Sequence, residues 1–157
     1  EESKTRPMGR GASGVRGITL AGPEDEVIGM VSVNDMDSNI LVVSENGYGK
    51  RSDLEDYRIT NRGGKGVKTI SITEKTGQLV ALKNVSDEDD LMIINKSGSA
   101  IRMSVSDLRV MGRATQGVRL INLKDNDSIA AVAKVMPDDE SIEDVNDLDV
   151  NDGTVIE

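Results

Sequence analysis

Basic side chains recur at equivalent places in three glycine-rich segments of this chain, and they are the residues best suited to chemistry. Gly-Val steps at Gly14, Gly66 and Gly117 mark the three segments. The basic positions form three columns with one residue per segment: Arg6, Arg58 and Arg109; Arg10, Arg62 and Arg113; and Arg16, Lys68 and Arg119. Because the planar guanidinium group of Arg binds two phosphate oxygens at once, the columns predict contacts with a phosphate backbone.

The glycines of the second segment strengthen this prediction. Gly63, Gly64 and Gly66 surround Arg62 and Lys65, and a loop without side chains lets backbone N–H groups approach phosphate closely. The same glycines also suit a tight connection between strands, because glycine adopts positive φ angles without strain. The two interpretations are compatible, and we expect all five residues to lie at the binding site.

The segments belong to a repeat with a period of 51 or 52 residues, which also places Arg51 and Arg102 at equivalent positions. We expect both of these arginines to contact phosphate as well. Repetition would align the basic columns along one rim of the molecule, and an aligned rim of cations suits the regularly spaced phosphates of a DNA duplex. The alternative is that duplication alone has kept solvated surface charges at these positions.

The elements between the columns are predicted to be short strands. The β-branched run 40–43 is followed by Asn46-Gly47, a strong hairpin signal, and the chain resumes at 49–52. Residues 66–73 alternate in polarity and are predicted to form a second hairpin with 79–85. An all-β repeat with four strands per unit is typical of a propeller blade, so we expect a propeller-like β-pinwheel.

This repeat divides the chain into four parts. Residues 1–33 are expected to form the latter part of one blade, 34–85 and 86–136 two complete blades, and 137–157 an acidic, disordered tail. The tail holds nine acidic residues and no Lys or Arg, so the formal net charge of −9 arises entirely within it. A second hypothesis is that the tail folds back onto the basic rim and competes with DNA.

Composition excludes several classes of function. The chain has no Cys and no His, and this removes thiolate metal sites and the commonest general base. Tyr48 and Tyr57 are its only aromatic residues, which argues against base stacking on single-stranded nucleic acid. No stretch approaches the length of a membrane helix, and we expect no membrane partner, no metal and no catalytic residue.

Three strings identify a family. Residues 8–18, 46–51 and 110–118 resemble the last blades of the bacterial gyrase A C-terminal domain, and the resemblance covers residues 3–136. It implies a disc whose basic perimeter wraps duplex DNA and so supports ATP-dependent negative supercoiling by the holoenzyme. It also implies a bacterial cytoplasmic location near the nucleoid, where the partners would be gyrase B and a second copy of gyrase A. ATP and Mg²⁺ would bind elsewhere in that assembly.

The resemblance departs from the family pattern in one place. Residues 60–66 match only the last five positions of the family's signature heptapeptide, Gln-Arg-Arg-Gly-Gly-Lys-Gly, so we interpret them as a similar loop in a later blade. The family's catalytic Tyr lies in a region that nothing here matches. Three alternatives stay open: the equivalent domain of topoisomerase IV, a propeller acting as a protein-interaction scaffold, and an independent enzyme.

Overall fold

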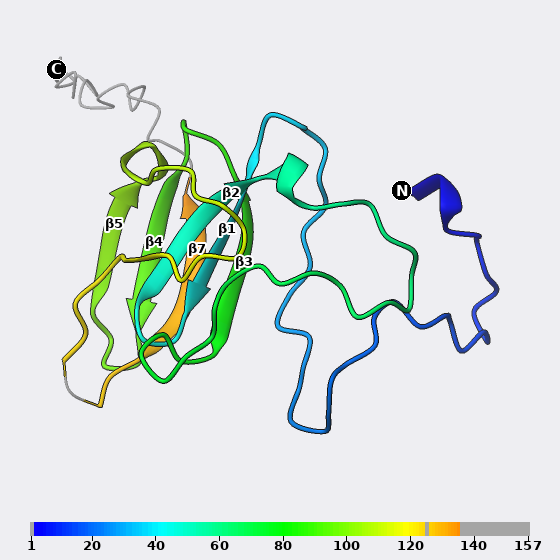
Figure 1. Cartoon of the computed structure of the whole chain (residues 1–157), viewed down its shortest axis with the longest axis horizontal. Helices are drawn as coiled ribbons and strands as arrows, with labels where there is room; N and C mark the ends of the chain where they lie inside the picture. Colours follow the sequence, from blue (N-terminus) through cyan, green and yellow to red (C-terminus); the bar gives the residue numbers. More distant parts are fainter. Residues whose placement is uncertain (1, 125, 136–157) are drawn as a thin grey trace, which may run out of the picture.

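The computed structural model describes residues 2–124 and 126–135, and within them the regular structure is almost entirely β (Figure 1). The prediction of an all-β fold is therefore confirmed. None of the helices among the described residues is long and apolar enough to cross a membrane. The strands are β1 (Asn39–Ser44), β2 (Tyr48–Asp53), β3 (Leu79–Val85), β4 (Asp90–Asn95), β5 (Ala100–Ser104), β6 (Val118–Arg119) and β7 (Ile129–Val135), and the 3-10 turns are η1 (Glu2–Lys4), η2 (Leu54–Asp56) and η3 (Val105–Asp107).

Two antiparallel sheets face each other across the core. The first has the strand order β3-β1-β2-β6 and the second has the order β5-β4-β7. The hairpin predicted around Asn46-Gly47 is confirmed, since β1 pairs with β2, and the equivalent hairpin of the next copy is formed by β4 and β5. The turn between β1 and β2 requires glycine, because Gly47 has a φ of 79° there.

The predicted second hairpin of the repeat is wrong. Residues 66–73 form no strand, and β3 pairs instead with β1. The turn before β3 is held by the β1–β2 turn, since Asn46 Nδ2 donates to the carbonyls of Glu74 and Lys75 at 3.1 and 3.2 Å. The direction of β3 is therefore set by these bonds between turns and not by pairing with residues 66–73.

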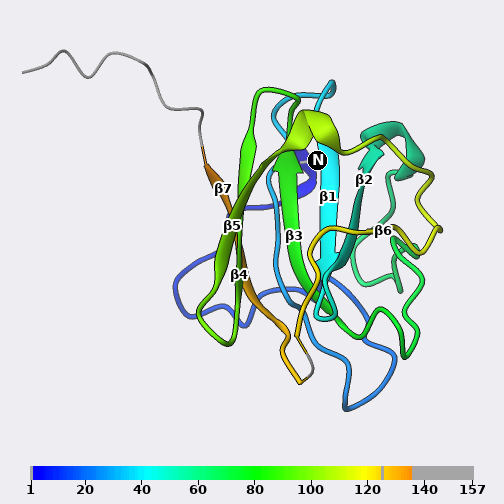
Figure 2. The ribbon, with the colours of Figure 1, turned by 90° about the vertical axis from the view of Figure 1, so that its left-hand side faces the viewer.

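The fourth strand of the first sheet comes from the next copy of the repeat. β6 pairs with β2 through Tyr48↔Arg119 and Gly49↔Val118, and Figure 2 shows β6 alongside β2. The four-stranded sheet is thus assembled from three strands of one copy and a short strand of the next copy. The second sheet has three strands within the described residues.

The core explains the purely apolar run at β1. Leu41 and Val43 are fully buried between the two sheets, where they pack with Leu91 and Ile93 of β4. The intervening residues of β1 point to the other face and form a smaller cluster around Ile70. Because β1 is buried on both faces, it lacks the alternation of a strand with one solvated face.

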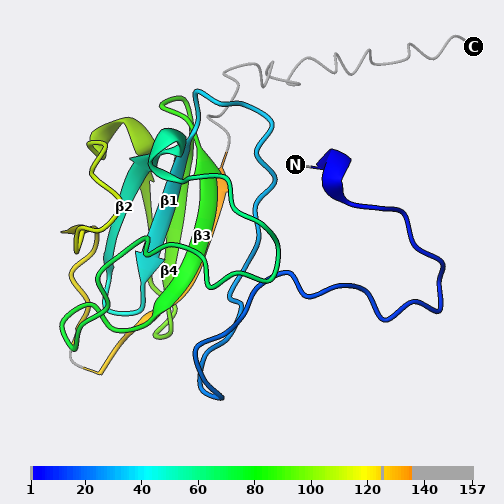
Figure 3. The same cartoon turned by 45° about the vertical axis from the view of Figure 1, so that its right-hand side comes forward.

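The N-terminal copy is arranged differently. Residues 5–38 contain no strand; the chain first extends away from the two sheets and then returns beside β3, where Val31 packs against the small cluster (Figure 3). Residues 27–33 are equivalent in the repeat to β3, which is paired along its length, but here Val27 is 63% and Met30 is 89% exposed. The described residues contain no hairpin that pairs with this segment. The expected acidic tail, residues 137–157, lies outside the described residues.

One prediction concerns Asp89 in the third copy. Burial disfavours its charged form, but hydrogen bonds from Ser86 and Lys134 outweigh that effect and hold its pKa below the usual 3.8. A carboxyl group with a lowered pKa stabilises the fold above its usual pKa and loses this contribution as pH falls through the folded pKa. We expect Asp89→Asn to lower the free energy of unfolding by about 2 kcal/mol at neutral pH.

Urea unfolding of both proteins at several pH values tests this expectation. The difference between wild type and Asp89→Asn should shrink as the pH falls below 3.8, where the unfolded carboxyl takes up a proton, and on through the lower pKa of the folded one. Asp107→Asn, at an exposed position on η3, serves as the control. A difference that stays constant through the acid range would contradict the role assigned to the Asp89 charge.

Candidate nucleic-acid interface

The glycine-rich loops of successive copies lie against the preceding copy through a repeated set of hydrogen bonds. Thr19 donates its backbone N–H to Gly64 O at 2.9 Å and its hydroxyl to Gly63 O at 2.6 Å. Ser71, its equivalent in the next copy, makes the same two bonds to Thr115 O and Ala114 O, at 3.2 and 3.1 Å. The same backbone and hydroxyl donors therefore hold both loops in the same way.

Sequence reasoning missed these two hydroxyl residues. Each lies five positions after a Gly-Val step, and Asn122 occupies the third place in that column. A small polar residue at a constant distance from each glycine loop was the signal that would have found them.

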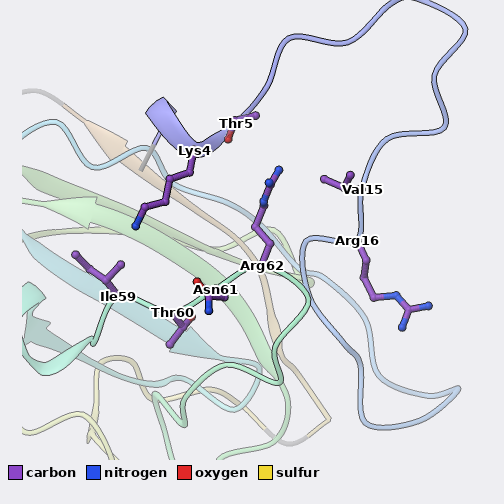
Figure 4. Close-up of a pocket in the computed structure, with 8 residues that line it drawn as sticks. All are labelled: Lys4, Thr5, Val15, Arg16, Ile59, Thr60, Asn61 and Arg62. Atoms are coloured by element: carbon purple, nitrogen blue, oxygen red, sulfur yellow. The ribbon is translucent and has the colours of Figure 1, made fainter.

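The first two copies create a basic pocket of about 490 Å³. Its lining includes Arg16 and Arg62, which belong to different basic columns, together with Lys4. Figure 4 shows the side chain of Arg62 extending toward Thr5, whereas that of Arg16 points away from the other labelled residues. Among the residues that the structure describes, no acidic side chain lines the pocket; the described lining residues are Lys4, Thr5, Val15, Arg16, Ile59, Thr60, Asn61 and Arg62.

Most of the predicted basic residues are exposed. Within the described residues their side chains make no hydrogen bond or ion pair, so they are available to a ligand; they are Arg6, Arg10, Arg16, Arg58, Arg62, Lys65, Lys68 and Arg109. Beside them, the N–H groups of Lys65 and Gly66 donate no hydrogen bond within the part of the chain that the structure describes. Gly64 is also exposed, but the N–H of Gly63 is occupied by Gly17 O at 2.7 Å.

Arg51 does not lie at the surface, so the expectation that it contacts phosphate does not fit the structure. It is 6% exposed, and its guanidinium donates to Leu108 O, to Asn39 Oδ1 at 3.3 Å and to Asp87. The equivalent Arg102 has a more exposed side chain that pairs with Asp90 at 2.7 Å. Arg51 is buried because the following copy covers β2, whereas no described strand lies beyond β5.

Arg113 is half-buried and turned toward the preceding copy. Its side chain donates to Asp56 O at 2.9 Å and to Lys68 O, and its backbone N–H donates to Asp56 Oδ2 at 3.2 Å. These three bonds hold the third loop in place. The guanidinium of Arg113 is therefore used within the protein, in contrast to that of Arg62.

Arg119 binds Tyr48. It donates to the phenol oxygen at 2.9 Å and lies 5.3 Å from the ring centre, and Lys75 approaches the same ring at 5.3 Å. The hydrogen bond from Arg119 lowers the pKa of Tyr48, with the charges of Arg119 and Lys75 adding to it while burial acts the other way. The third basic column thus has a structural contact in this copy, since β6 brings Arg119 onto β2.

No group of three or more His, Cys, Asp or Glu side chains in the described residues is arranged to hold a metal ion. The chemistry of this surface is instead that of exposed cations beside glycine-rich backbone, which suits anions that recur at regular spacing.

Comparison with known proteins agrees with the sequence resemblance. The family described as "DNA gyrase C-terminal domain, beta-propeller" matches residues 6–34, 38–86 and 89–136. The DNA gyrase A protein of Staphylococcus aureus strain MRSA252 is 51% identical over 156 residues, which covers 98% of this chain and 17% of that relative. Its counterpart in strain NCTC 8325 is 52% identical over 147 residues, covering 91% of this chain and 16% of the relative.

Solved structures show the same fold. A DNA gyrase A C-terminal domain matches with a TM-score of 0.74 and 31% identity, over 83% of this chain and 44% of that one. The C-terminal domain of a DNA topoisomerase IV matches with a TM-score of 0.72 over 78% of this chain and 38% of that one, but at 20% identity it supports the fold alone. With three repeats matched and half of its residues identical to those of gyrase A proteins, the chain belongs to the family of DNA gyrase A C-terminal domains.

Proposed function

We propose that this chain binds duplex DNA along its exposed basic columns and bends it around the molecule. The observation that carries the proposal is the surface around Arg62. There, exposed cations from two successive copies lie at one pocket, and no carboxylate belongs to the described part of its lining. The N–H groups of Lys65 and Gly66, which have no partner among the described residues, lie in the adjoining loop and suit phosphate oxygens. Arginine and backbone N–H together are the usual donors to phosphate in protein–DNA contacts.

Duplex DNA fits this surface better than single strands do. Proteins that bind single strands stack the bases on exposed aromatic rings. Tyr48 is 6% exposed, and Tyr57 packs beside the small cluster around Ile70. Neither ring offers a stacking platform, and no helix long enough to enter a major groove occurs among the described residues. Binding through phosphates alone makes the bending cost of the DNA the source of any sequence preference.

The wider role follows from the family. In a complete gyrase, wrapping by this domain would present a DNA segment for strand passage and so support ATP-dependent negative supercoiling. Gyrase B and a second copy of gyrase A would be its partners in the bacterial cytoplasm, and ATP and Mg²⁺ would bind in other parts of that assembly. This chain would itself be non-catalytic: the hydroxyl of Tyr48 is bound by Arg119, and that of Tyr57 contacts Thr69.

A salt titration of DNA binding tests the proposal. We expect the double variant Arg62→Ala and Lys65→Ala of the full chain to bind duplex DNA of any sequence more weakly than wild type. Each lost phosphate contact should reduce the slope of log K against log salt by about 0.9, because fewer counterions are released. The control is Lys96→Ala, which removes an exposed lysine outside the columns and should leave the slope unchanged.

The outcomes separate the alternatives. A protein-interaction scaffold predicts no DNA affinity, or an affinity that the double variant and the control change equally. To distinguish gyrase from topoisomerase IV, the same double substitution is introduced into the complete protein. Wrapping predicts a greater loss of negative supercoiling than of decatenation, and the reverse order would favour a topoisomerase IV-like role.

A further inference from the structure

Lys50 is a buried cation that holds the loop of the following copy. It lies in β2 and is 1% exposed, yet among the described residues no carboxylate forms an ion pair with its ammonium group. Its Nζ donates instead to the carbonyl oxygens of Gly112, at 2.5 Å, and of Arg113. Burial lowers the pKa of Lys50, since the charged form is costly to desolvate. An ammonium kept in such a place is expected to have a specific task.

The neighbours of Lys50 on β2 form hydrogen bonds with the same loop. Ser52 Oγ donates to Met111 O at 2.7 Å, and the N–H of Met111 donates to Arg51 O at 2.9 Å. Three consecutive carbonyls, at residues 111, 112 and 113, are therefore turned toward β2 and occupied there.

This orientation determines where the loop's N–H groups point. In a trans peptide the C=O and the following N–H point in opposite directions, and no cis peptide is present among the described residues. The N–H groups of Arg113 and Ala114 therefore point away from Lys50. That of Arg113 is occupied by Asp56 Oδ2, whereas that of the exposed Ala114 has no partner within the described residues.

The second and third loops differ in what they present. In the second loop Arg62 is free at the surface, and the N–H of Gly63, the equivalent of Ala114, is occupied by Gly17 O. In the third loop the guanidinium of Arg113 is turned inward, and it is the N–H of Ala114 that is available. The third copy has Ile101 at the position of Lys50, so a buried lysine that binds the next loop occurs once among the described copies.

We infer that Lys50 is a positioning residue for DNA binding, which turns the third loop so that the N–H of Ala114 donates to a DNA phosphate. The inference rests on the proposed function and adds a contact that carries no side-chain charge. A backbone N–H releases no condensed counterion, so its loss weakens binding without changing the salt slope. This separates it from the contacts of Arg62 and Lys65.

The experiment combines NMR with DNA titration on the full chain. In the wild type, adding duplex DNA should move the amide proton of Ala114 downfield, as expected for a new hydrogen bond to phosphate. Lys50→Met keeps the length of the side chain and removes its donors. It should abolish the Ala114 shift and weaken binding by about tenfold, the loss of one charge-assisted hydrogen bond, with an unchanged salt slope.

The controls keep the inference separate from the proposed function. Lys96→Met removes a surface charge without touching the loop and should preserve the Ala114 shift. If Lys50→Met does not fold, the wild-type titration still tests the inference. An Ala114 amide proton whose chemical shift does not change at saturating DNA would overturn it. If DNA binding depends on Arg62 but the Ala114 amide shift does not change, the inference about Lys50 is wrong and the proposed function stands. No DNA binding by the wild type would remove the proposed function with it.

Discussion

Replacing Arg51 with Ala is expected to lower the free energy of unfolding by about 3 kcal/mol, because it leaves two buried acceptors without a hydrogen-bond donor. The guanidinium donates to Leu108 O and to Asn39 Oδ1, and both partners lie in the interior. Its ion pair with Asp87 adds little to this figure, because the Asp87 side chain is 73% exposed and solvent screens the pair. Urea unfolding of the full chain measures the loss.

The equivalent arginine of the next copy is the matched control. Arg102 has a side chain that is 37% exposed, and replacing it with Ala should cost no more than about 1 kcal/mol. A salt titration provides a second test. If Arg51 is structural, Arg51→Ala keeps the wild-type salt slope under conditions in which it is folded. Equal stability losses in the two variants, or a slope lowered by the first, would contradict this assignment.

Gly117→Ala is the second substitution with a large expected effect, and it tests the pairing of β6 with β2 of the preceding copy. Gly117 has a φ of 82°, and a Cβ there would lie 2.6 Å from Gly49 O and 3.0 Å from Gly49 C. Backbone atoms of β2 cannot move away without breaking its pairing with β1. We expect a loss of about 3 kcal/mol, of which left-handed backbone strain accounts for roughly 1 to 2.

The same repeat position in the first copy isolates the steric part of the effect. Gly14 has a nearly identical φ of 80°, but nothing lies within 4 Å of a Cβ added there. Gly14→Ala should therefore cost only the strain. Hydrogen exchange gives the local readout, because the N–H of Leu120 donates to Gly47 O at 2.8 Å only while β6 stays on β2. Similar losses for both variants, with Leu120 still protected, would show that β6 pairing tolerates the side chain.

Much of the fold was predictable from local sequence. The hairpin around Gly47 follows from an apolar run before a turn signal and lies where it was predicted, and the repeat places a second such hairpin around Gly98. The prediction failed at residues 66–73, whose alternating polarity matched that of a strand. Ile70 is buried as the pattern indicates, but against β1 from one side of the sheet and not within a hairpin. Periodicity reports that a face is buried, and it does not report which neighbour covers it.

The candidate site divides in the same way. Three basic columns were visible in the sequence, and Arg62 of the second column is exposed in the structure, as is Lys65 beside it. Residues at equivalent positions of the repeat have different surroundings, because each copy contacts a different neighbouring copy. Arg119 reaches Tyr48 through β6, whereas the same position in the first copy, Arg16, lies at the edge of an open pocket. Lys50 carried no signal at all, since a lysine in a strand is usually solvated.

The sequence by itself determined the family, the all-β class, the period of the repeat and the positions that are basic in every copy. These properties depend on residue type and spacing, and both are inherited when a unit is duplicated. Only the tertiary structure decided that β6 completes the preceding sheet, that Arg51 and Lys50 are buried beneath the next copy, and which cations remain exposed. The physical reason is that burial and hydrogen bonding between copies arise from contacts between distant residues, which identical local patterns do not specify.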